Sequence, residues 1–540
     1  MIRRSGEKLS NNSLKPAAYQ LVPLIKLLLN GFNALLISDG VGVGKTISAG
    51  YIISYFSTFG QPSLIVAPPM LVDKWILELR NKFNIKSIPI RSVEEFSTAV
   101  SEIKLESQSV YIMSSSILLN RKLKILVEKL GLIVFDEIHN YRNPETISYQ
   151  KALTLSKQAT YRIGLSATPI NNSLKDLITE MSILLPNLEF SLIDAIIKDN
   201  WERNNNLITI PLTTRFTKER LGIHFAKRII THHSISYPSI YINKVKDKIE
   251  NLPQNERNSV FEKITYYRMA TSSPAAISKA LDLDFSLRQD PKFEEFKKIL
   301  MTSQSPHMLV FCEFEDTAKY ISENLDNVES YLVSGAIPLF DRQAKINAFR
   351  RTDKGVLIMT PVGTEGIDLQ FCSSLCNYDL HWNPMKIEQR IGRIDRIGQE
   401  KKEIYIHNFI VEGSIDANVI TKLTNKLNII ANSIFKINEI ISSNDSNVTL
   451  LANEEILEKE IVEGDTLAAT LKFNQEILEK DYDLAKLIKN ELCQPFTIRQ
   501  AGMEKMTYRQ FIEEDPKSSD IVDYYLKKTH ELDQLIKLYE

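Results

Sequence analysis

The chain carries at residues 39–46 the sequence Asp39-Gly40-Val41-Gly42-Val43-Gly44-Lys45-Thr46, directly after the apolar run Ala34-Leu35-Leu36-Ile37. This order predicts a strand, a glycine-rich loop and then a helix. The glycines let backbone N–H groups surround the phosphates of a nucleotide, and the helix N-terminus favours an anion. We expect Lys45 to reach the outer phosphates and the Thr46 hydroxyl to hold magnesium. The stretch therefore predicts a nucleotide-binding α/β domain.

Length and composition indicate a protein of several domains. The chain has 540 residues, enough for roughly three or four domains of ordinary size. It carries 66 Lys and Arg against 67 Asp and Glu, a formal net charge of −1, so any surface for nucleic acid must be local. Its four cysteines are too few for a disulfide framework, which favours reduced thiols and a cytoplasmic protein. No segment is typical of a signal peptide or a membrane span.

Short apolar runs alternate with helical periodicity in two parts of the chain, which predicts two parallel sheets covered by helices. The runs lie at residues 34–38, 63–67, 109–113, 132–135 and 161–165, and again at 308–312, 330–333, 356–359, 375–378 and 404–409. Between them the pattern is polar and helical, and after residue 441 the chain is rich in Glu, Lys, Leu and Ile at helical spacing. We expect this last part to be a solvated helical extension in preference to a coiled-coil dimer. The expected domains are residues 1–185, 186–285 (a helical insertion), 286–441 and 442–540.

Two further segments carry residues suited to catalysis. Asp136 and Glu137 follow the apolar run at 132–135, at the end of a parallel strand where ligands bind. We expect Asp136 to hold magnesium partly through water and Glu137 to activate the attacking water, which indicates hydrolysis as well as binding. Arg393 and Arg396 are three residues apart on a predicted helix, so both can face a γ-phosphate and stabilise its charge during transfer. ATP would then lie between two lobes.

Taken in order, these segments resemble those of superfamily-two helicases, and among them the Swi/Snf-type ATPases. Asp39 fits the family's loop pattern, Asp-Glu-x-Gly-Leu-Gly-Lys-Thr, whereas Gly40 stands where the family usually has Glu. Further matches are Leu14-Lys15-Pro16 with Tyr19-Gln20, Ile65-Val66-Ala67-Pro68 with Lys74-Trp75, Ser166-Ala167-Thr168-Pro169, Trp382-Asn383-Pro384 and the stretch from Gln389 to Gln399. Residues 272–274, 363–369 and 390–396 look closest to the bacterial branch that includes RapA-like proteins and helicase-like subunits of phage-defence systems.

The resemblance implies two RecA-like parallel-sheet lobes that use ATP and Mg²⁺, so the expected fold class is α/β with a helical insertion and a helical C-terminal extension. It places Gln20 at the adenine and adds further nucleotide-binding residues. These are Asp39, Gly40, Val41, Gly42, Val43, Gly44, Lys45, Thr46, Gly366, Asp368 and Gln389. It also implies contacts to the phosphate backbone of duplex nucleic acid. Candidates for these contacts are Pro68, Lys74, Ser114 to Ser116, Ser334, Gly335 and Arg342, whereas Trp75 and Trp382 are expected to pack in the core.

Three functions fit these features. The first is an ATP-dependent double-stranded DNA translocase or remodeller whose targets are chosen by partner subunits, for example in a bacterial defence system. The second is an RNA polymerase recycling factor of the RapA kind. The third is an ATP-gated DNA-binding or regulatory subunit whose nucleotide state switches its contacts to partner proteins. All three use the same nucleotide site.

Overall fold

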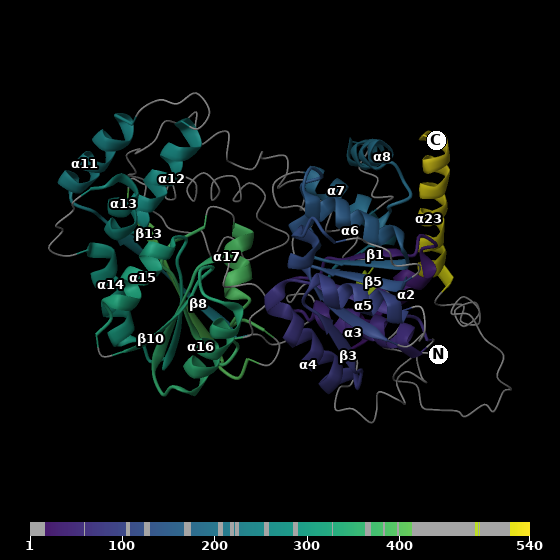
Figure 1. Ribbon diagram of the computed structural model, residues 1–540, viewed down its shortest axis with the longest axis horizontal. Coiled ribbons are helices and arrows are strands. Elements are labelled where there is room, and N and C mark those ends of the chain that lie inside the picture. Colours follow the sequence, from purple (N-terminus) through teal and green to yellow (C-terminus); the bar gives the residue numbers. More distant parts are fainter. Residues whose placement is uncertain are drawn as a thin grey trace. The chain divides into compact units, whose positions relative to one another are not determined.

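The computed structural model describes most of the chain up to residue 412 and two parts of the C-terminal region. The described ranges are 17–58, 60–103, 109–123, 130–166, 174–202, 209–216, 221, 226–252, 259–283, 290–326, 328–361, 369–381, 384–396, 399–412, 481–483, 485–486 and 519–539. The chain divides into two compact units, shown in Figure 1. Unit 1 comprises Met1–Ile223 and Glu463–Glu540, and unit 2 comprises His224–Val462.

Unit 1 is built on a parallel sheet. Its strands are β1 (Ala34–Ile37), β2 (Ser63–Ala67), β3 (Ser87–Ile90), β4 (Val110–Ser114), β5 (Leu130–Asp136), β6 (Ala159–Leu165) and β7 (Thr213–Thr214). They form a seven-stranded sheet in the order β3-β4-β2-β5-β6-β1-β7, in which every pairing is parallel. Strands β1, β2, β4 and β5 are buried along their whole length, which explains why they read as continuous apolar runs.

Helices cover both faces of this sheet. They are α2 (Ala18–Leu29), α3 (Lys45–Thr58), α4 (Val72–Phe83), α5 (Val93–Ile103), α6 (Ile147–Lys157), α7 (Leu174–Leu184), α8 (Phe190–Glu202), α9 (Thr209–Leu212) and α23 (Ser519–Tyr539). In Figure 1, α6 and α7 lie on one side of β1 and β5, and α3 and α4 lie on the other. The connections β1–α3 and β2–α4 therefore bring the loops after these strands to one edge of the sheet.

Unit 2 contains the second parallel sheet. Its strands are β8 (Lys227–Ile235), β9 (His307–Phe311), β10 (Glu329–Val333), β11 (Gly355–Met359), β12 (Ser374–Asn377) and β13 (Glu403–Val411), in the order β10-β11-β9-β12-β13-β8. Its helices are α11 (Ser239–Glu250), α12 (Ser259–Ser272), α13 (Pro274–Leu281), α14 (Pro291–Thr302), α15 (Glu315–Glu323), α16 (Leu339–Arg351) and α17 (Pro384–Ile391). The buried Phe296 and Tyr378 rings pack edge to face in its core, with centroids 5.9 Å apart.

The two predicted sheets are confirmed, and most of the described residues between 186 and 283 are helical. These residues nevertheless contribute β7 to one sheet and β8 to the other, which the sequence did not predict. The expectation of a solvated C-terminal extension is wrong for α23, because Tyr525, Leu532 and Ile536 are buried in the core of unit 1. Cys312, Cys372 and Cys376 are buried free thiols, as expected from the cysteine usage.

Candidate active site

The glycine-rich stretch forms a tight loop between β1 and α3, as the sequence predicted. Gly42 and Gly44 have φ values of 80° and 103°, which only glycine adopts without strain. Helix α3 begins at Lys45, and Thr46 lies in its first turn. The Lys45 ammonium donates to the carbonyls of residues 39 and 40, at 3.0 and 3.3 Å, so it lies against the backbone of the loop. Backbone N–H groups, a helix N-terminus and an ammonium together suit the phosphates of a nucleotide.

Asp39 supports this loop from inside the protein. Its side chain is buried and accepts a hydrogen bond from the backbone N–H of Phe216 at 3.0 Å. Burial raises the pKa of the Asp39 carboxyl to about 7, and the nearby Lys45 ammonium opposes this rise. The N–H of Gly40 donates in turn to the carbonyl of Phe216 at 2.7 Å. Asp39 therefore holds the start of the loop against the segment after β7, and its contact with a nucleotide stays a prediction.

The acid pair lies at the carboxyl end of β5, where it was predicted. Trp75 of α4 donates its indole N–H to an Asp136 carboxylate oxygen at 2.8 Å. Burial and the charge of Glu137 raise the pKa of Asp136 to about 7, whereas the Trp75 hydrogen bond and the charges of Lys74 and Lys45 act in the opposite direction. Trp75 is 1% exposed, which confirms that it packs in the core. Its contact with Asp136 was not foreseen.

Glu137 adopts an unusual backbone conformation. Its φ and ψ are 51° and 53°, in the left-handed region, which is costly for a residue with a Cβ and is found preferentially at functional sites. Its carboxylate lies 3.4 Å from Nδ1 of His139, and the same nitrogen lies 3.3 Å from the Ser166 hydroxyl. Ser166 directly follows β6, so these contacts connect the acid pair to the end of the neighbouring strand.

Helix α2 brings Gln20 next to the phosphate loop. The Tyr19 hydroxyl donates to the carbonyl of Val43 at 3.0 Å, and the Gln20 amide nitrogen lies 3.3 Å from that hydroxyl. A Cβ built on Gly44 would lie 3.6 Å from the same amide nitrogen. The structure thus places Gln20 beside the loop, and the hydrogen bond by which Tyr19 links it to the loop was not predicted.

The predicted arginines of unit 2 lie in the turn that follows α17. Arg393 is largely buried, and Arg396 donates from Nε to the carbonyl of Gly392 at 2.8 Å. Gln389 is half-buried on α17 itself. These three residues come from one short segment, but the prediction that one helix carries both arginines is wrong, because α17 ends at Ile391. Outside the described residues lie Gly366, Asp368, Ala167, Thr168, Pro169 and Trp382.

Arg390 anchors α17 to the sheet of unit 2, a role that was not predicted from the sequence. It is 7% exposed and donates to the Asn377 side chain at 3.2 Å and to the carbonyl of Asp379 at 2.7 Å. Its guanidinium also forms an ion pair with Glu313. A planar guanidinium with several donors suits such multiple contacts. Arg390 therefore fixes the helix that precedes Arg393 and Arg396.

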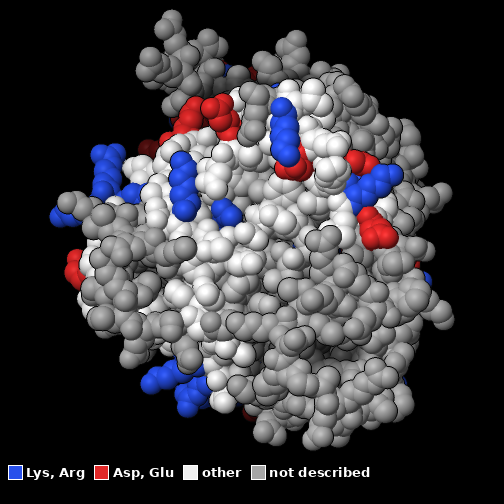
Figure 2. Space-filling model, turned by 90° about the vertical axis from the view of Figure 1, so that its right-hand side faces the viewer, with Lys and Arg blue, Asp and Glu red and all other residues white. Residues whose placement is uncertain are grey.

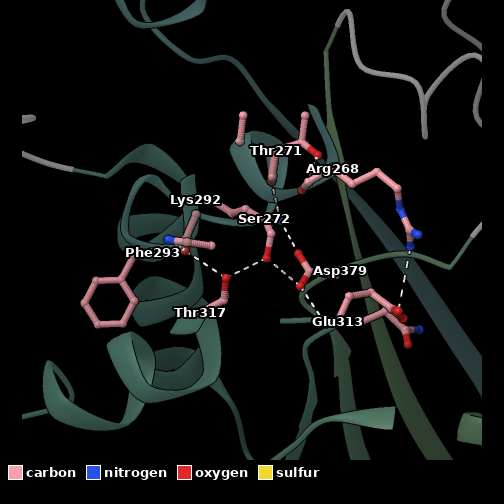
Figure 3. A network of polar contacts seen from close by, with 12 residues as sticks. Arg268, Thr271, Ser272, Lys292, Phe293, Glu313, Thr317 and Asp379 are labelled. Atoms are coloured by element: carbon pink, nitrogen blue, oxygen red, sulfur yellow. Dashed lines mark hydrogen bonds and ion pairs between the residues drawn. The ribbon is translucent and has the colours of Figure 1, made fainter. Parts of the chain in front are cut away.

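Asp379 is the centre of a buried polar network at the end of β12, shown in Figure 3. Its carboxylate accepts hydrogen bonds from the Ser272 hydroxyl at 2.7 Å, the Lys292 ammonium at 2.9 Å and the backbone N–H of Glu313 at 2.8 Å. The Ser272 and Thr317 hydroxyls lie 2.7 Å apart. Ser272, one of the residues that suggested the bacterial branch, thus belongs to the structural core that holds Arg390 and Glu313 in place.

Some of the candidate phosphate contacts lie near the ends of strands, whereas Lys74 and Arg342 lie in helices α4 and α16. Ser114 is the last residue of β4, and its hydroxyl lies 2.8 Å from that of Ser116. In unit 2 Arg342 donates to the carbonyls of Gly335 and Ile337, at 2.7 and 2.6 Å. Figure 2 shows one face on which the described basic and acidic side chains are interspersed. Contact of these residues with nucleic acid stays a prediction.

Two families of helicase domains match this chain. Residues 21–265 match the SNF2-related domain, and residues 291–398 match the helicase conserved C-terminal domain. The chain is a Snf2-type ATPase of helicase superfamily two. This assignment confirms the resemblance seen in the sequence, the ATPase activity and the use of ATP. The phosphate loop and the acid pair of this Snf2-type ATPase both lie within the SNF2-related domain.

Several known proteins are similar to this Snf2-type ATPase. The uncharacterized ATP-dependent helicase YqhH of Bacillus subtilis is 27% identical over 472 residues, covering 80% of this chain and 81% of the relative. The RNA polymerase-associated protein RapA of Actinobacillus pleuropneumoniae serotype 3 is 26% identical over 461 residues, covering 71% of this chain and 46% of the relative. The chain thus spans about half the length of the RapA proteins that it matches.

Two solved structures are also similar to this chain. The Sulfolobus solfataricus SWI2/SNF2 ATPase core in complex with double-stranded DNA is 22% identical, with a TM-score of 0.35, and covers 84% of this chain and 98% of its own. The Pyrococcus furiosus Hef helicase domain is 19% identical, with a TM-score of 0.45, and covers 76% of this chain and 98% of its own.

Proposed function

We propose that this Snf2-type ATPase is a double-stranded DNA translocase or remodeller. The observation that carries the proposal is the acid pair Asp136-Glu137 inside the SNF2-related domain, with Asp136 held by Trp75 and Glu137 in a left-handed backbone conformation. A protein that only bound ATP would not need Glu137, whose left-handed backbone conformation costs free energy. ATP turnover is therefore available to drive movement along a duplex.

The residues of unit 1 fit the requirements of Mg²⁺ and ATP. The Thr46 hydroxyl and the Asp136 carboxylate are oxygen ligands of the kind that Mg²⁺ prefers, and the indole N–H of Trp75 needs an acceptor oxygen on Asp136. Bound Mg²⁺ would neutralise charge on the outer phosphates. Lys45 would contact those phosphates, and Glu137 would accept a proton from the attacking water.

Unit 2 would supply the remaining catalytic charge. In this proposal ATP binds between two RecA-like lobes, and Arg393 and Arg396 stabilise the charge that moves onto the transferred phosphoryl group. Gln389, Gly366 and Asp368 would complete the nucleotide contacts. The anchoring of α17 through Arg390 supports this role, because the arginines that follow the helix need a fixed position to act on a phosphate.

Grip on the duplex is proposed to involve the phosphate backbone alone. The net charge of −1 is consistent with a small number of local contacts from the ends of strands. We further propose that partner proteins select the target, a bacterial defence system being one such setting, and that the protein acts in the cytoplasm. Within the described part of the chain, no helix has the length and apolar character needed to cross a membrane.

A second candidate function is RNA polymerase recycling. It is favoured by the 26% identity to RapA across 71% of this chain. A third is an ATP-gated regulatory subunit, in which the same site would switch contacts to partners without movement along DNA. Co-purification with RNA polymerase would favour the second, and ATP-dependent but hydrolysis-independent function would favour the third.

The test is ATP hydrolysis by the purified chain with no nucleic acid, single-stranded DNA, duplex DNA or RNA, followed by displacement of a triplex-forming strand from a duplex. We expect stimulation by duplex DNA, and a loss of roughly 10²- to 10⁴-fold in Glu137→Gln, because the variant lacks the proton acceptor. The exposed Glu145 provides the matched control Glu145→Gln, which should behave as the parent protein. Duplex-stimulated hydrolysis that survives in Glu137→Gln would refute the assigned role, and hydrolysis without strand displacement would refute translocation.

A further inference from the structure

A buried ion pair joins the C-terminal region to the nucleotide-binding unit. Asp481 is 0% exposed, and one of its carboxylate oxygens lies 2.9 Å from the Lys26 ammonium of α2. The same oxygen accepts a hydrogen bond from the Tyr525 hydroxyl of α23 at 3.0 Å. Its other oxygen accepts from the backbone N–H of Arg215 at 2.8 Å. Lys26 also donates to the carbonyl of Thr213. The network thus joins four separate parts of the sequence.

These contacts occupy the outer edge of the sheet of unit 1. β7 is the last strand in the sheet order, and its inner edge pairs with β1. In a strand, the carbonyl of one residue and the N–H of the second residue after it point to the same edge. The carbonyl of Thr213 and the N–H of Arg215 therefore face away from β1. Lys26 and Asp481 satisfy them in place of a further strand.

The inner edge of the same segment holds the start of the phosphate loop. The carbonyl of Thr214 accepts from both the N–H and the hydroxyl of Ser38, at 2.8 Å each. The Arg215 guanidinium donates to the carbonyl of Ser38 at 2.8 Å. Phe216 exchanges backbone contacts with the Asp39 side chain and the Gly40 N–H. Residues 213–216 thus form a bridge between the ion pair and the loop.

An aromatic chain runs parallel to this bridge. The Tyr482 ring packs on Phe216 with centroids 5.4 Å apart, and Phe216 packs on Tyr19 with centroids 5.5 Å apart. The Tyr19 hydroxyl donates to the carbonyl of Val43 in the phosphate loop. Residues 481 and 482 therefore contact the support of this loop in two chemically different ways, by charge and by ring packing.

The Asp481 and Lys26 charges stabilise the protein only as a pair, because both are buried. Burial raises the pKa of Asp481 and lowers the pKa of Lys26, and in each case the partner's charge opposes the effect of burial. Removal of one partner leaves an uncompensated charge in the protein interior, whereas removal of both does not. Loss of the contact between Asp481 and Lys26 would therefore cost a large free energy, which keeps the segment that carries Asp481 in this position.

From this geometry we infer that Asp481 is a positioning residue for the phosphate loop, so that the C-terminal region sets the affinity of unit 1 for the phosphates of ATP. Among the described residues, Asp481 forms no hydrogen bond or ion pair with the loop, and its contacts reach the loop through residues 213–216. Its charge also helps to raise the pKa of Asp39. A C-terminal segment that left this position would release the outer edge of β7 and, with it, Ser38 and Gly40.

The test compares binding of a fluorescent, non-hydrolysable ATP analogue, ATP turnover and thermal unfolding in four full-length variants. In Asp481→Asn we expect the Kd for the analogue and the KM for ATP to rise by at least about tenfold, with a smaller change in kcat, because Lys26 loses its counter-charge. Asp483→Asn, two residues along the same helical turn and half-exposed, is the matched control and should match the parent protein. Lys26→Met combined with Asp481→Asn should restore most of the lost affinity.

Tyr525→Phe keeps the ion pair and removes one donor, so it remains testable even if Asp481→Asn fails to fold. We expect it to raise KM by about two- to threefold with unchanged kcat. Parent-like analogue affinity in folded Asp481→Asn, or in Tyr525→Phe if the first variant does not fold, would overturn the inference. So would a double variant that regains its unfolding temperature without regaining affinity.

Discussion

Replacement of Trp75 by phenylalanine isolates one contact of the candidate active site. The indole N–H lies 2.8 Å from the carboxylate oxygen of Asp136 that it serves, and both side chains are buried. Phenylalanine keeps most of the ring but has no donor. Since Asp136 is the proposed ligand of Mg²⁺ through water, the loss should appear in the binding and turnover of Mg²⁺-ATP as well as in stability.

The expected loss of activity can be derived from the free energy of the hydrogen bond between Trp75 and Asp136. A bond to a charged group contributes about 1.5–3 kcal/mol, which corresponds to a factor of roughly 10 to 150 in an equilibrium or rate constant. We therefore expect Trp75→Phe to lower kcat/KM for ATP by a factor in this range and to raise the Mg²⁺ concentration needed for half-maximal turnover. The lost ring atoms also leave a small cavity, which lowers the free energy of unfolding separately.

The control must carry a similar cavity without the hydrogen bond. Phe83 lies on the same helix, is buried and packs against Tyr51 with ring centroids 5.2 Å apart. Phe83→Leu should therefore lower the unfolding temperature while leaving the Mg²⁺ dependence of turnover at the parent value. Turnover is measured over a titration of Mg²⁺ at fixed ATP, below the unfolding temperature of both variants. If Trp75→Phe and Phe83→Leu shift together in stability and neither shifts in Mg²⁺ dependence, the positioning role of Trp75 is wrong.

Two further outcomes are expected in unit 2. Arg390→Met should lower the free energy of unfolding of this unit by about 1.5–3 kcal/mol, because the half-buried Glu313 loses one charged partner and keeps the other, Arg268. It should also reduce kcat. Denaturant titration and turnover measure the two effects, and Arg351→Met on an exposed helix end should change neither. Burial, and secondarily His233, lowers the pKa of His407 to about 4, below the usual value of about 6.5 in an unfolded chain. The unfolded state therefore takes up the proton first as the pH falls, so up to about 3 kcal/mol of stability, fully present above pH 6.5, should be lost between pH 6.5 and 4. His407→Gln should flatten this pH dependence in denaturant titrations, and an unchanged slope would contradict the assignment.

Strand prediction worked where the strands are covered on both faces. A strand such as β2, buried at every residue, reads as an apolar run whatever its neighbours are. β8 has neither an apolar run nor strict alternation, because it lies at the edge of its sheet and is only partly covered. β7 has two residues, so only its pairing with β1 defines it as a strand. Which strands lie at the edge of a sheet depends on the rest of the fold, so these two strands could not be predicted from the sequence.

The place of a candidate site could be predicted where its residues are close together in sequence. The phosphate loop and the acid pair each follow one strand within a few residues, so the sequence alone predicted where they lie. The partner of Trp75 lies 61 residues away, and the residues that Arg390 contacts belong to other strands and loops. Such supports depend on which parallel strands become neighbours. The candidate catalytic side chains were therefore predictable from the sequence, whereas the residues that hold them in position became visible only in the fold.

The sequence indicates that Lys26 needs a counter-charge, but it does not indicate which residue supplies it. A lysine within a buried helical face needs a counter-charge, because an isolated ammonium in the interior is very costly. In the sequence Lys26 interrupts an apolar stretch, and any of the 67 acidic residues could be its partner. The structure assigns Asp481, 455 residues away, and so attaches the C-terminal region to the unit that holds the phosphate loop. The nucleotide-binding unit is therefore discontinuous in sequence, since the Lys26 charge of α2 is balanced by a residue that comes after the whole of unit 2.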